Sequence, residues 1–199
     1  MKFIAGHEQT RQALAGWAGD KKLLVARFYF WSSGSPLQRS QEGLLRCLLY
    51  QILTQAPEMI PIAVPRRWQT AGDSPRTNEP WTRKEISDAF SAIVNVIPSR
   101  VNVCFFIDGL DEYGGSDLAN GESDLELVSQ LKKLASSPHV KLCLSSRPRN
   151  VFQNHLISDE SRHITLHNHT AQDIEQFVQL RISIVRQLID IDPSDLEEL

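Results

Sequence analysis

The chain has 199 residues, of which 41% are hydrophobic and 23% are charged, a composition typical of globular proteins with an apolar core. Its 21 basic and 24 acidic residues give a formal net charge of −3, which argues against a dedicated nucleic-acid or membrane-surface binder. No apolar run approaches the roughly 18 residues that a membrane span requires, and the opening MKFIAGHEQT turns polar too soon for a signal peptide. We therefore expect a cytoplasmic protein with no nucleic-acid and no membrane partner.

The three cysteines, Cys47, Cys104 and Cys143, stand far apart within apolar runs. Their number is odd and their spacing matches no C-x-x-C metal motif, so we expect buried free thiols in a reducing compartment. This expectation agrees with a cytoplasmic location.

Helix-like and strand-like patterns alternate in the first eighty residues. Residues 1–17 predict a helix, and the apolar run KLLVARFYF (22–30) predicts a buried strand. Leucines and isoleucines at helical spacing predict a helix over residues 40–57, with Ser40 as its N-cap. The proline-rich residues 57–80 predict an irregular surface segment. The packing candidates of the first helix are Phe3, Ile4, Leu14 and Trp17.

The alternation continues through the rest of the chain. TRKEISDAFSAIVNVI predicts a helix stopped by Pro98, and DLELVSQLKKLASS predicts another helix. The runs VNVCFFID and VKLCLSS predict a second and a third strand, and RHITL predicts a fourth. A final helix is expected from Thr170, with Asp173 three residues on as its capping-box partner. The apolar face of this helix comprises Ile174, Phe177, Val178, Ile182, Val185 and Ile189.

The predicted strands share one property, which is that each is apolar almost throughout. Strands without a polar face are typical of parallel sheets that helices cover on both sides. The connections between them are long enough for right-handed crossovers. The sequence therefore predicts an α/β fold built on a parallel sheet.

Polar residues follow two of these strands at their carboxyl ends, where open parallel sheets bind ligands. Asp108 ends the second strand and precedes Gly109, Asp111 and Glu112, while Arg147 follows the third strand. A carboxylate at a strand end suits Mg²⁺, which takes one or two protein carboxylates besides water and phosphate oxygens. Asp111 or Glu112 could polarise an attacking water, and Arg147 could neutralise a terminal phosphate. The alternative is a solvated turn in which Gly109 adopts a special backbone angle.

A nucleotide site also needs a phosphate-binding loop, and the sequence contains no motif for one. No lysine follows a glycine, so G-x-x-x-x-G-K-[ST] is absent, and G-x-G-x-x-G is absent as well. His163, His167 and His169 lie close together, but their flanks favour a strand edge and a loop over a metal site. The residues thus predict the metal strand of a nucleotide hydrolase without its phosphate loop.

Four segments resemble a known family: FYFWSSGSPLQRSQEGLLRCLLYQIL, VCFFIDGLDEY, VKLCLSSRPRN and LHNHTAQDIEQFV. They are similar to parts of the NACHT-type NTPase domain of fungal signal-transducing NTPases, the nephrocystin-like group of NOD-like receptors. In order, those parts are the second strand with its helix, the Walker B strand, the sensor strand and the entry to the helical region. The resemblance covers nearly the whole chain. It implies a partial nucleotide-binding domain over residues 1–168 and the start of a helical region over residues 169–199.

The resemblance implies a P-loop NTPase-like three-layer core without its first strand, the Walker A strand. In the family, that strand and its P-loop come immediately before the helix that begins this chain, and the strand lies beside the sensor strand. Asp108 would coordinate Mg²⁺, Asp111 and Glu112 would be the catalytic acids, and Arg147 would be the sensor. ATP and Mg²⁺ are the cofactors of the intact family.

The resemblance also implies a parent function, which is an ATP-gated oligomerising switch in fungal innate immunity or heterokaryon incompatibility. Because the phosphate loop is absent from the sequence, we expect this chain alone to bind ATP weakly or not at all and to carry no cofactor. We expect protein partners or self-association. The alternative is a pseudo-NTPase that serves as a scaffold or protein-interaction module.

Overall fold

The computed structural model describes residues 1–70, 80–114, 121–157 and 159–189. Contacts within the chain divide it into two compact units, residues 1–156 and residues 157–199. The first unit holds every strand and every candidate site residue, and the second holds the last long helix. The candidate site can therefore be described within the first unit alone.

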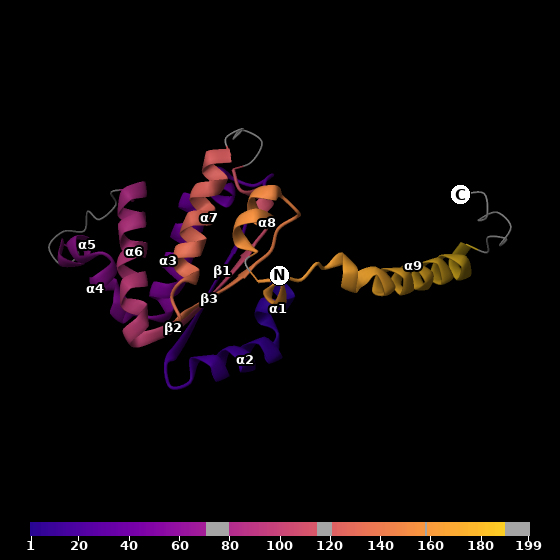
Figure 1. The fold of residues 1–199 in the computed structure, drawn as a ribbon, viewed down its shortest axis with the longest axis horizontal. Coiled ribbons are helices and arrows are strands. Elements are labelled where there is room, and N and C mark those ends of the chain that lie inside the picture. Colours follow the sequence, from indigo (N-terminus) through magenta and orange to yellow (C-terminus); the bar gives the residue numbers. More distant parts are fainter. Residues whose placement is uncertain (71–79, 115–120, 158, 190–199) are drawn as a thin grey trace. The chain divides into compact units, whose positions relative to one another are not determined.

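The sheet consists of β1 (Lys22–Tyr29), β2 (Val101–Asp108) and β3 (Val140–Leu144), all parallel and in the order β1-β2-β3. Tyr29 pairs with Asp108, so β1 and β2 end together at the carboxyl edge. Val101–Ile107 are all buried, as expected for a central strand covered on both faces. The α/β class, the parallel sheet and these three strands are confirmed (Figure 1).

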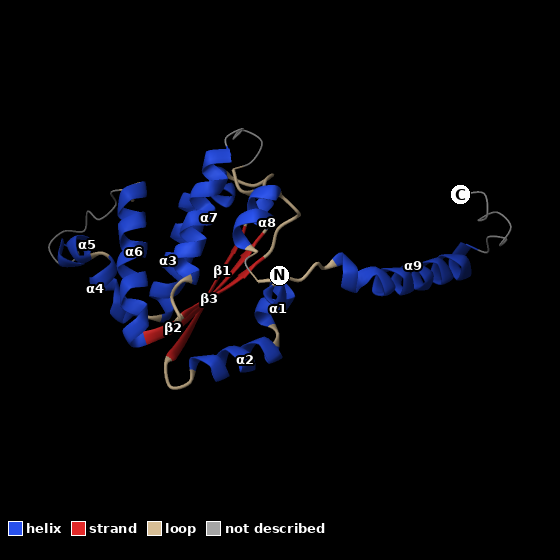
Figure 2. Cartoon of the chain, viewed as in Figure 1, coloured by secondary structure: helices blue, strands red, loops and turns tan. Residues whose placement is uncertain are grey.

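Helices cover both faces of this sheet (Figure 2). The larger core lies between one face and α3, α4, α6, α7 and α8, and a smaller core lies between the other face and α1 and α2. No helix among the described residues is long and apolar enough to span a membrane. The α-helices are α1 (Lys2–Gly6), α2 (Glu8–Ala18), α3 (Gln41–Gln55), α4 (Ile60–Ala63), α5 (Pro65–Thr70), α6 (Arg83–Arg100), α7 (Gly121–Ala135), α8 (Asn150–Leu156) and α9 (His167–Ile189). Short 3₁₀ helices are η1 (Pro36–Arg39), η2 (Pro57–Met59), η3 (Leu110–Glu112) and η5 (Glu160–Arg162).

Helix α3 begins where the sequence predicts. The Ser40 hydroxyl accepts a hydrogen bond from the Gly43 N–H at 3.2 Å, which satisfies one of the unpaired donors of the first turn. Gly43 also lets the preceding turn pack closely, because a Cβ there would lie 1.7 Å from the Leu37 carbonyl oxygen. The loop that leaves β1 is thereby held tightly against α3.

Two glutamines of α3 close the outer edge of β1. The Gln55 side chain accepts from the Val25 N–H at 3.1 Å and donates to the Val25 carbonyl at 2.8 Å. The Gln51 side chain does the same for Arg27, at 3.0 Å and 2.7 Å. These amides take the place of a neighbouring strand and cover backbone groups that would otherwise invite pairing with another chain.

Several predicted elements differ from the structure. RHITL forms no strand: its residues are in a 3₁₀ turn or in irregular backbone, and Ile164 and Leu166 are exposed. Helix α6 does not stop at Pro98 but continues to Arg100, because proline's fixed φ is itself helical. Helix α9 begins before Thr170, whose hydroxyl donates to the Leu166 carbonyl at 3.2 Å instead of capping.

The segment predicted as irregular is partly helical. Residues 57–70 form η2, α4 and α5, and Met59 and Ala63 are buried against the core, so apolar burial outweighs the proline content. Residues 71–79 of that prediction lie outside the described residues. At the other end of the chain, Phe3 and Ile4 are exposed rather than packed, because the helix predicted for residues 1–17 breaks at His7.

The expected thiols are all free, but only one of them is fully buried. Cys104 is buried beneath α2, whereas Cys47 and Cys143 are half-buried. Burial raises the pKa of the Cys104 thiol to about 12 and also raises the pKa of Cys143.

Candidate functional site

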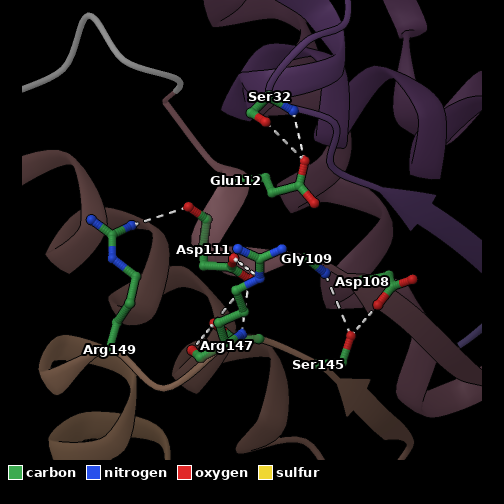
Figure 3. A network of polar contacts seen from close by, with 9 residues as sticks. Ser32, Asp108, Gly109, Asp111, Glu112, Ser145, Arg147 and Arg149 are labelled. Carbon is green, nitrogen blue, oxygen red and sulfur yellow. Dashed lines mark hydrogen bonds and ion pairs between the residues drawn. The ribbon is translucent and has the colours of Figure 1, made fainter. Parts of the chain in front are cut away.

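The candidate site lies at the carboxyl edge of the sheet, where β2 and β3 end side by side. The Ser145 N–H donates to the Ile107 carbonyl at 3.0 Å, and the Leu110 N–H donates to the Ser145 carbonyl at 3.0 Å. These two bonds extend the strand pairing beyond the end of β3. They bring the segments after both strands into one network of polar contacts (Figure 3).

Asp108 is the last residue of β2, and its side chain is held by β3. Its Oδ1 accepts a short hydrogen bond from the Ser145 hydroxyl, which in turn accepts from the Gly109 N–H at 3.4 Å. No described residue makes a hydrogen bond or ion pair to Oδ2 of Asp108. One carboxylate oxygen is thus fixed by the protein, while the other remains available to a ligand.

Gly109 turns the chain sharply away from the strand. Its φ of 72° and ψ of 42° are left-handed, and a Cβ there would lie 3.3 Å from the Phe30 carbonyl oxygen. A glycine is favoured because other residues pay steric strain in this conformation. The special backbone angle of the alternative interpretation is therefore present, and it also brings η3 back over the ends of the strands.

Asp111 binds the loop that follows β3. Its Oδ1 accepts from the Arg147 N–H at 2.9 Å and from the Ser146 hydroxyl at 3.4 Å. Its Oδ2 lies 3.8 Å from Nε of Arg147. The Arg149 guanidinium donates to the Asp111 carbonyl at 3.4 Å and pairs with Asp124 at 3.4 Å. Asp111 therefore fixes the backbone that carries Arg147.

Glu112 binds the loop that follows β1. Its Oε2 accepts from the Ser32 N–H at 2.8 Å and from the Ser32 hydroxyl at 3.1 Å (Figure 3). Nearby, the buried Tyr113 ring packs edge-on against Phe30 at 5.5 Å between ring centroids. Glu112 and Tyr113 thus contact the segment between β1 and α3 through hydrogen bonds and through ring packing, respectively.

The four predicted site residues come together as their strand-end positions suggest, but they differ in exposure. The Arg147 side chain is 89% exposed, whereas the side chain of Asp111 is only 14% exposed. The Arg147 guanidinium, 3.8 Å from Asp111, is therefore accessible to a ligand while its backbone stays fixed. Ser32 and Arg149 also belong to this network but were not predicted from the sequence. The signal for Ser32 was present, since a polar residue after β1 must lie at the same edge as those after β2 and β3.

The donor set suits a hard divalent cation such as Mg²⁺. Its ligands would be carboxylate and hydroxyl oxygens, with Asp108 as the candidate direct ligand. Among the described residues, no group of three or more histidines, cysteines or carboxylates forms a metal cage. The single strand-end carboxylate of Asp108, with Oδ1 held by Ser145, fits Mg²⁺, because that ion keeps several waters and uses few protein carboxylates.

Comparison with known proteins adds one match. The family model described as "Nephrocystin 3, N-terminal" matches residues 2–147. The matched region runs from α1 to Arg147 and includes the whole sheet and all four candidate site residues. No curated protein and no solved structure gives a significant match.

Proposed function

The chain belongs to the nephrocystin 3 N-terminal family, and from this premise we propose that its carboxyl sheet edge is the metal-binding and sensor half of a nucleoside-triphosphate site. The observation that carries the proposal is the geometry of Asp108: a strand-end carboxylate with one oxygen fixed by Ser145 and the other without a partner among the described residues. The NACHT-type resemblance supports ATP with Mg²⁺ as the ligand.

Each residue has a role that its contacts support. Asp108 would hold the cation, and Ser145 holds the carboxylate in place. When bound, Mg²⁺ supplies charge neutralisation to phosphate oxygens. Asp111 and Glu112 are the acids from which the proton acceptor for water would come, and the exposed Arg147 side chain would neutralise the terminal phosphate. By the NACHT-type resemblance, the whole protein would be a cytoplasmic switch. The nucleotide bound at this site would control its oligomerisation in fungal immunity or heterokaryon incompatibility.

Of the phosphate contacts of such a site, the sequence provides the arginine Arg147 but no phosphate-binding loop. It contains no G-x-x-x-x-G-K-[ST] motif, whose backbone N–H groups and lysine surround the phosphates. Three or four charge-assisted hydrogen bonds contribute roughly 5–10 kcal/mol. A micromolar site is worth about 8 kcal/mol in total. The isolated chain should therefore bind ATP–Mg²⁺ more weakly than micromolar and should not hydrolyse it efficiently.

The test is cation binding by the purified chain. Mn²⁺, a paramagnetic substitute for Mg²⁺, is titrated while water-proton relaxation is measured. Asp108→Asn should weaken binding about tenfold, which corresponds to about 1.4 kcal/mol. Asp20→Asn is the matched control, because Asp20 is an exposed aspartate in the loop before β1, at the opposite edge of the sheet. Equal Mn²⁺ binding by wild type and Asp108→Asn would refute the proposal.

A second candidate function is a pseudo-NTPase scaffold or protein-interaction module. Two observations favour it: Asp111 and Glu112 accept hydrogen bonds from loop backbones, and α9 exposes an apolar face. That face comprises Ile174, Phe177, Val178, Ile182 and Val185, which are 38–58% exposed. This function predicts that Asp108→Asn leaves association unchanged. Light scattering after size-exclusion chromatography compares the molar mass of wild type with that of Asp108→Asn and so tests this second function.

A further inference from the structure

The two neighbouring acids of η3 differ in what the second oxygen of each carboxylate faces. Both carboxylate oxygens of Asp111 face the Arg147 loop, one at 2.9 Å from the Arg147 N–H and the other at 3.8 Å from Nε. Glu112 uses only Oε2, which takes both hydrogen bonds from Ser32. Its Oε1 has no hydrogen-bond partner among the described residues and lies 3.5 Å from where a Cβ of Gly109 would be.

We propose that Ser32 is a positioning residue of the site: it holds Glu112 so that Oε1 faces the end of β2 and accepts a hydrogen bond from water around the Asp108 cation. Asp111 has a different task, which is to position Arg147. The inference rests on the proposed function, because it requires a cation at Asp108. It assigns the water-binding role to one acid, where the sequence alone leaves Asp111 and Glu112 equivalent.

The loop that carries Ser32 is rigid enough to orient a carboxylate. The Trp31 N–H donates to the Gln38 carbonyl at 3.1 Å, and the Gly34 N–H donates to the Trp31 carbonyl at 3.0 Å. Ser35 and Gln38 form a capping box at the start of η1. The Ser32 N–H is therefore fixed in direction before Glu112 binds it. Groups that hold a metal-site residue in this way commonly affect metal affinity tenfold or more.

A hydrated Mg²⁺ needs acceptors for the protons of its waters. A carboxylate with one oxygen anchored by two donors still presents an unused oxygen of fixed direction. Glu112 meets this requirement, and its Oε1 lies over Gly109, the residue directly after the candidate metal ligand. The second oxygen of Asp111 is placed differently, because Oδ2 faces the Arg147 guanidinium in an ion pair at 3.8 Å.

The first experiment uses the metal-free chain and follows amide hydrogen exchange by NMR. Glu112→Ala should accelerate exchange at the Ser32 amide and leave the Arg147 amide protected. Asp111→Ala should do the reverse. Glu112→Gln keeps an acceptor oxygen and should restore protection at Ser32, so that a general loss of folding is distinguished from loss of this contact. Unchanged protection of Ser32 in Glu112→Ala would overturn the anchoring part of the proposal.

The second experiment measures Mn²⁺ affinity by water-proton relaxation. Glu112→Gln should weaken binding at least about threefold more than Asp111→Asn, which removes the same charge and is therefore the matched control. Ser32→Ala, which removes no charge, should also weaken binding, and Ser32→Thr should restore it. If Asp108→Asn binds like wild type, the proposed function fails and this inference fails with it. If binding depends on Asp108 but Glu112→Gln equals Asp111→Asn, this inference alone is overturned.

Discussion

The glutamines that cover the edge of β1 allow a quantitative test of the fold. Gln51 and Gln55 make four hydrogen bonds to the N–H and carbonyl groups of Val25 and Arg27, at 2.7–3.1 Å. Each such bond contributes about 0.5–1.5 kcal/mol net, so the four contribute roughly 2–6 kcal/mol. Replacing both glutamines by alanine exposes the strand edge to water, which recovers part of this free energy, and alanine favours the helix by a few tenths of a kcal/mol per site. We expect the double variant to lose about 2–3 kcal/mol of unfolding free energy.

Urea unfolding followed by circular dichroism measures this loss. Gln153→Ala is the matched control, because Gln153 is an exposed helical glutamine of α8 whose side chain makes no hydrogen bond to the described residues. It should leave the urea midpoint within experimental error of wild type. Light scattering should also show that the double variant self-associates more than wild type, since an uncovered strand edge invites pairing. A double variant that unfolds at the wild-type midpoint would refute the conclusion that these amides substitute for a strand.

Three further predictions concern stability, pH and thiol chemistry. Gly43→Ala places a Cβ against backbone and should cost about 1–3 kcal/mol in urea unfolding, whereas Gly16→Ala, with nothing within 4 Å, should be neutral or stabilising. The pKa of Glu85 is lowered from 4.5 to about 2, first by its hydrogen bond from Arg67. Its stabilising contribution is therefore complete above pH 4.5 and is lost as pH falls toward 2, so the urea midpoint of Glu85→Gln should vary less than that of wild type across this range. Cys104, with its pKa raised to about 12 by burial, should be the last cysteine that iodoacetamide alkylates in the native chain, as peptide mass spectrometry can show.

The sheet and the location of the site were predictable from sequence for the same physical reason. A strand buried on both faces is apolar almost throughout, so β2 is visible as an apolar run that contains only Asn102 before Asp108. β1 is also mostly apolar, although it carries Arg27 and is fully buried only at alternate residues. Because parallel strands end at one edge, the polar residues after β2 and β3 had to lie near each other. Asp108, Asp111 and Arg147 could therefore be placed together before any coordinates were known.

The contacts that bind this edge together were not predictable, because they depend on partners far apart in sequence. Ser32 and Glu112 are separated by 80 positions, and nothing in WSSGSP specifies which donor points at which acid. The same holds for Gln51, whose helical position is typical of a solvent-facing residue until the packing of α3 beside β1 is known. RHITL is the converse case, a strand that was predicted but does not form. Its isoleucine and threonine favour a strand, but strand propensity depends strongly on the surrounding structure.

The hydrogen bonds at this edge change how the motif should be interpreted. Asp111 and Glu112 hold the loops after β3 and β1, so both acids have a structural reason to be present whether or not a nucleotide is hydrolysed. Asp108 is different: its contact is a single hydroxyl from Ser145, and Oδ2 makes no contact with the described residues. A buried carboxylate oxygen without a partner is costly, whereas one at a strand end can bind water or a cation. Substitution of Asp108 is therefore the best test of whether this turn is a metal site or only a structural turn. Substitution of Asp111 and Glu112 alone would not separate an effect on the loop structure from an effect on metal binding.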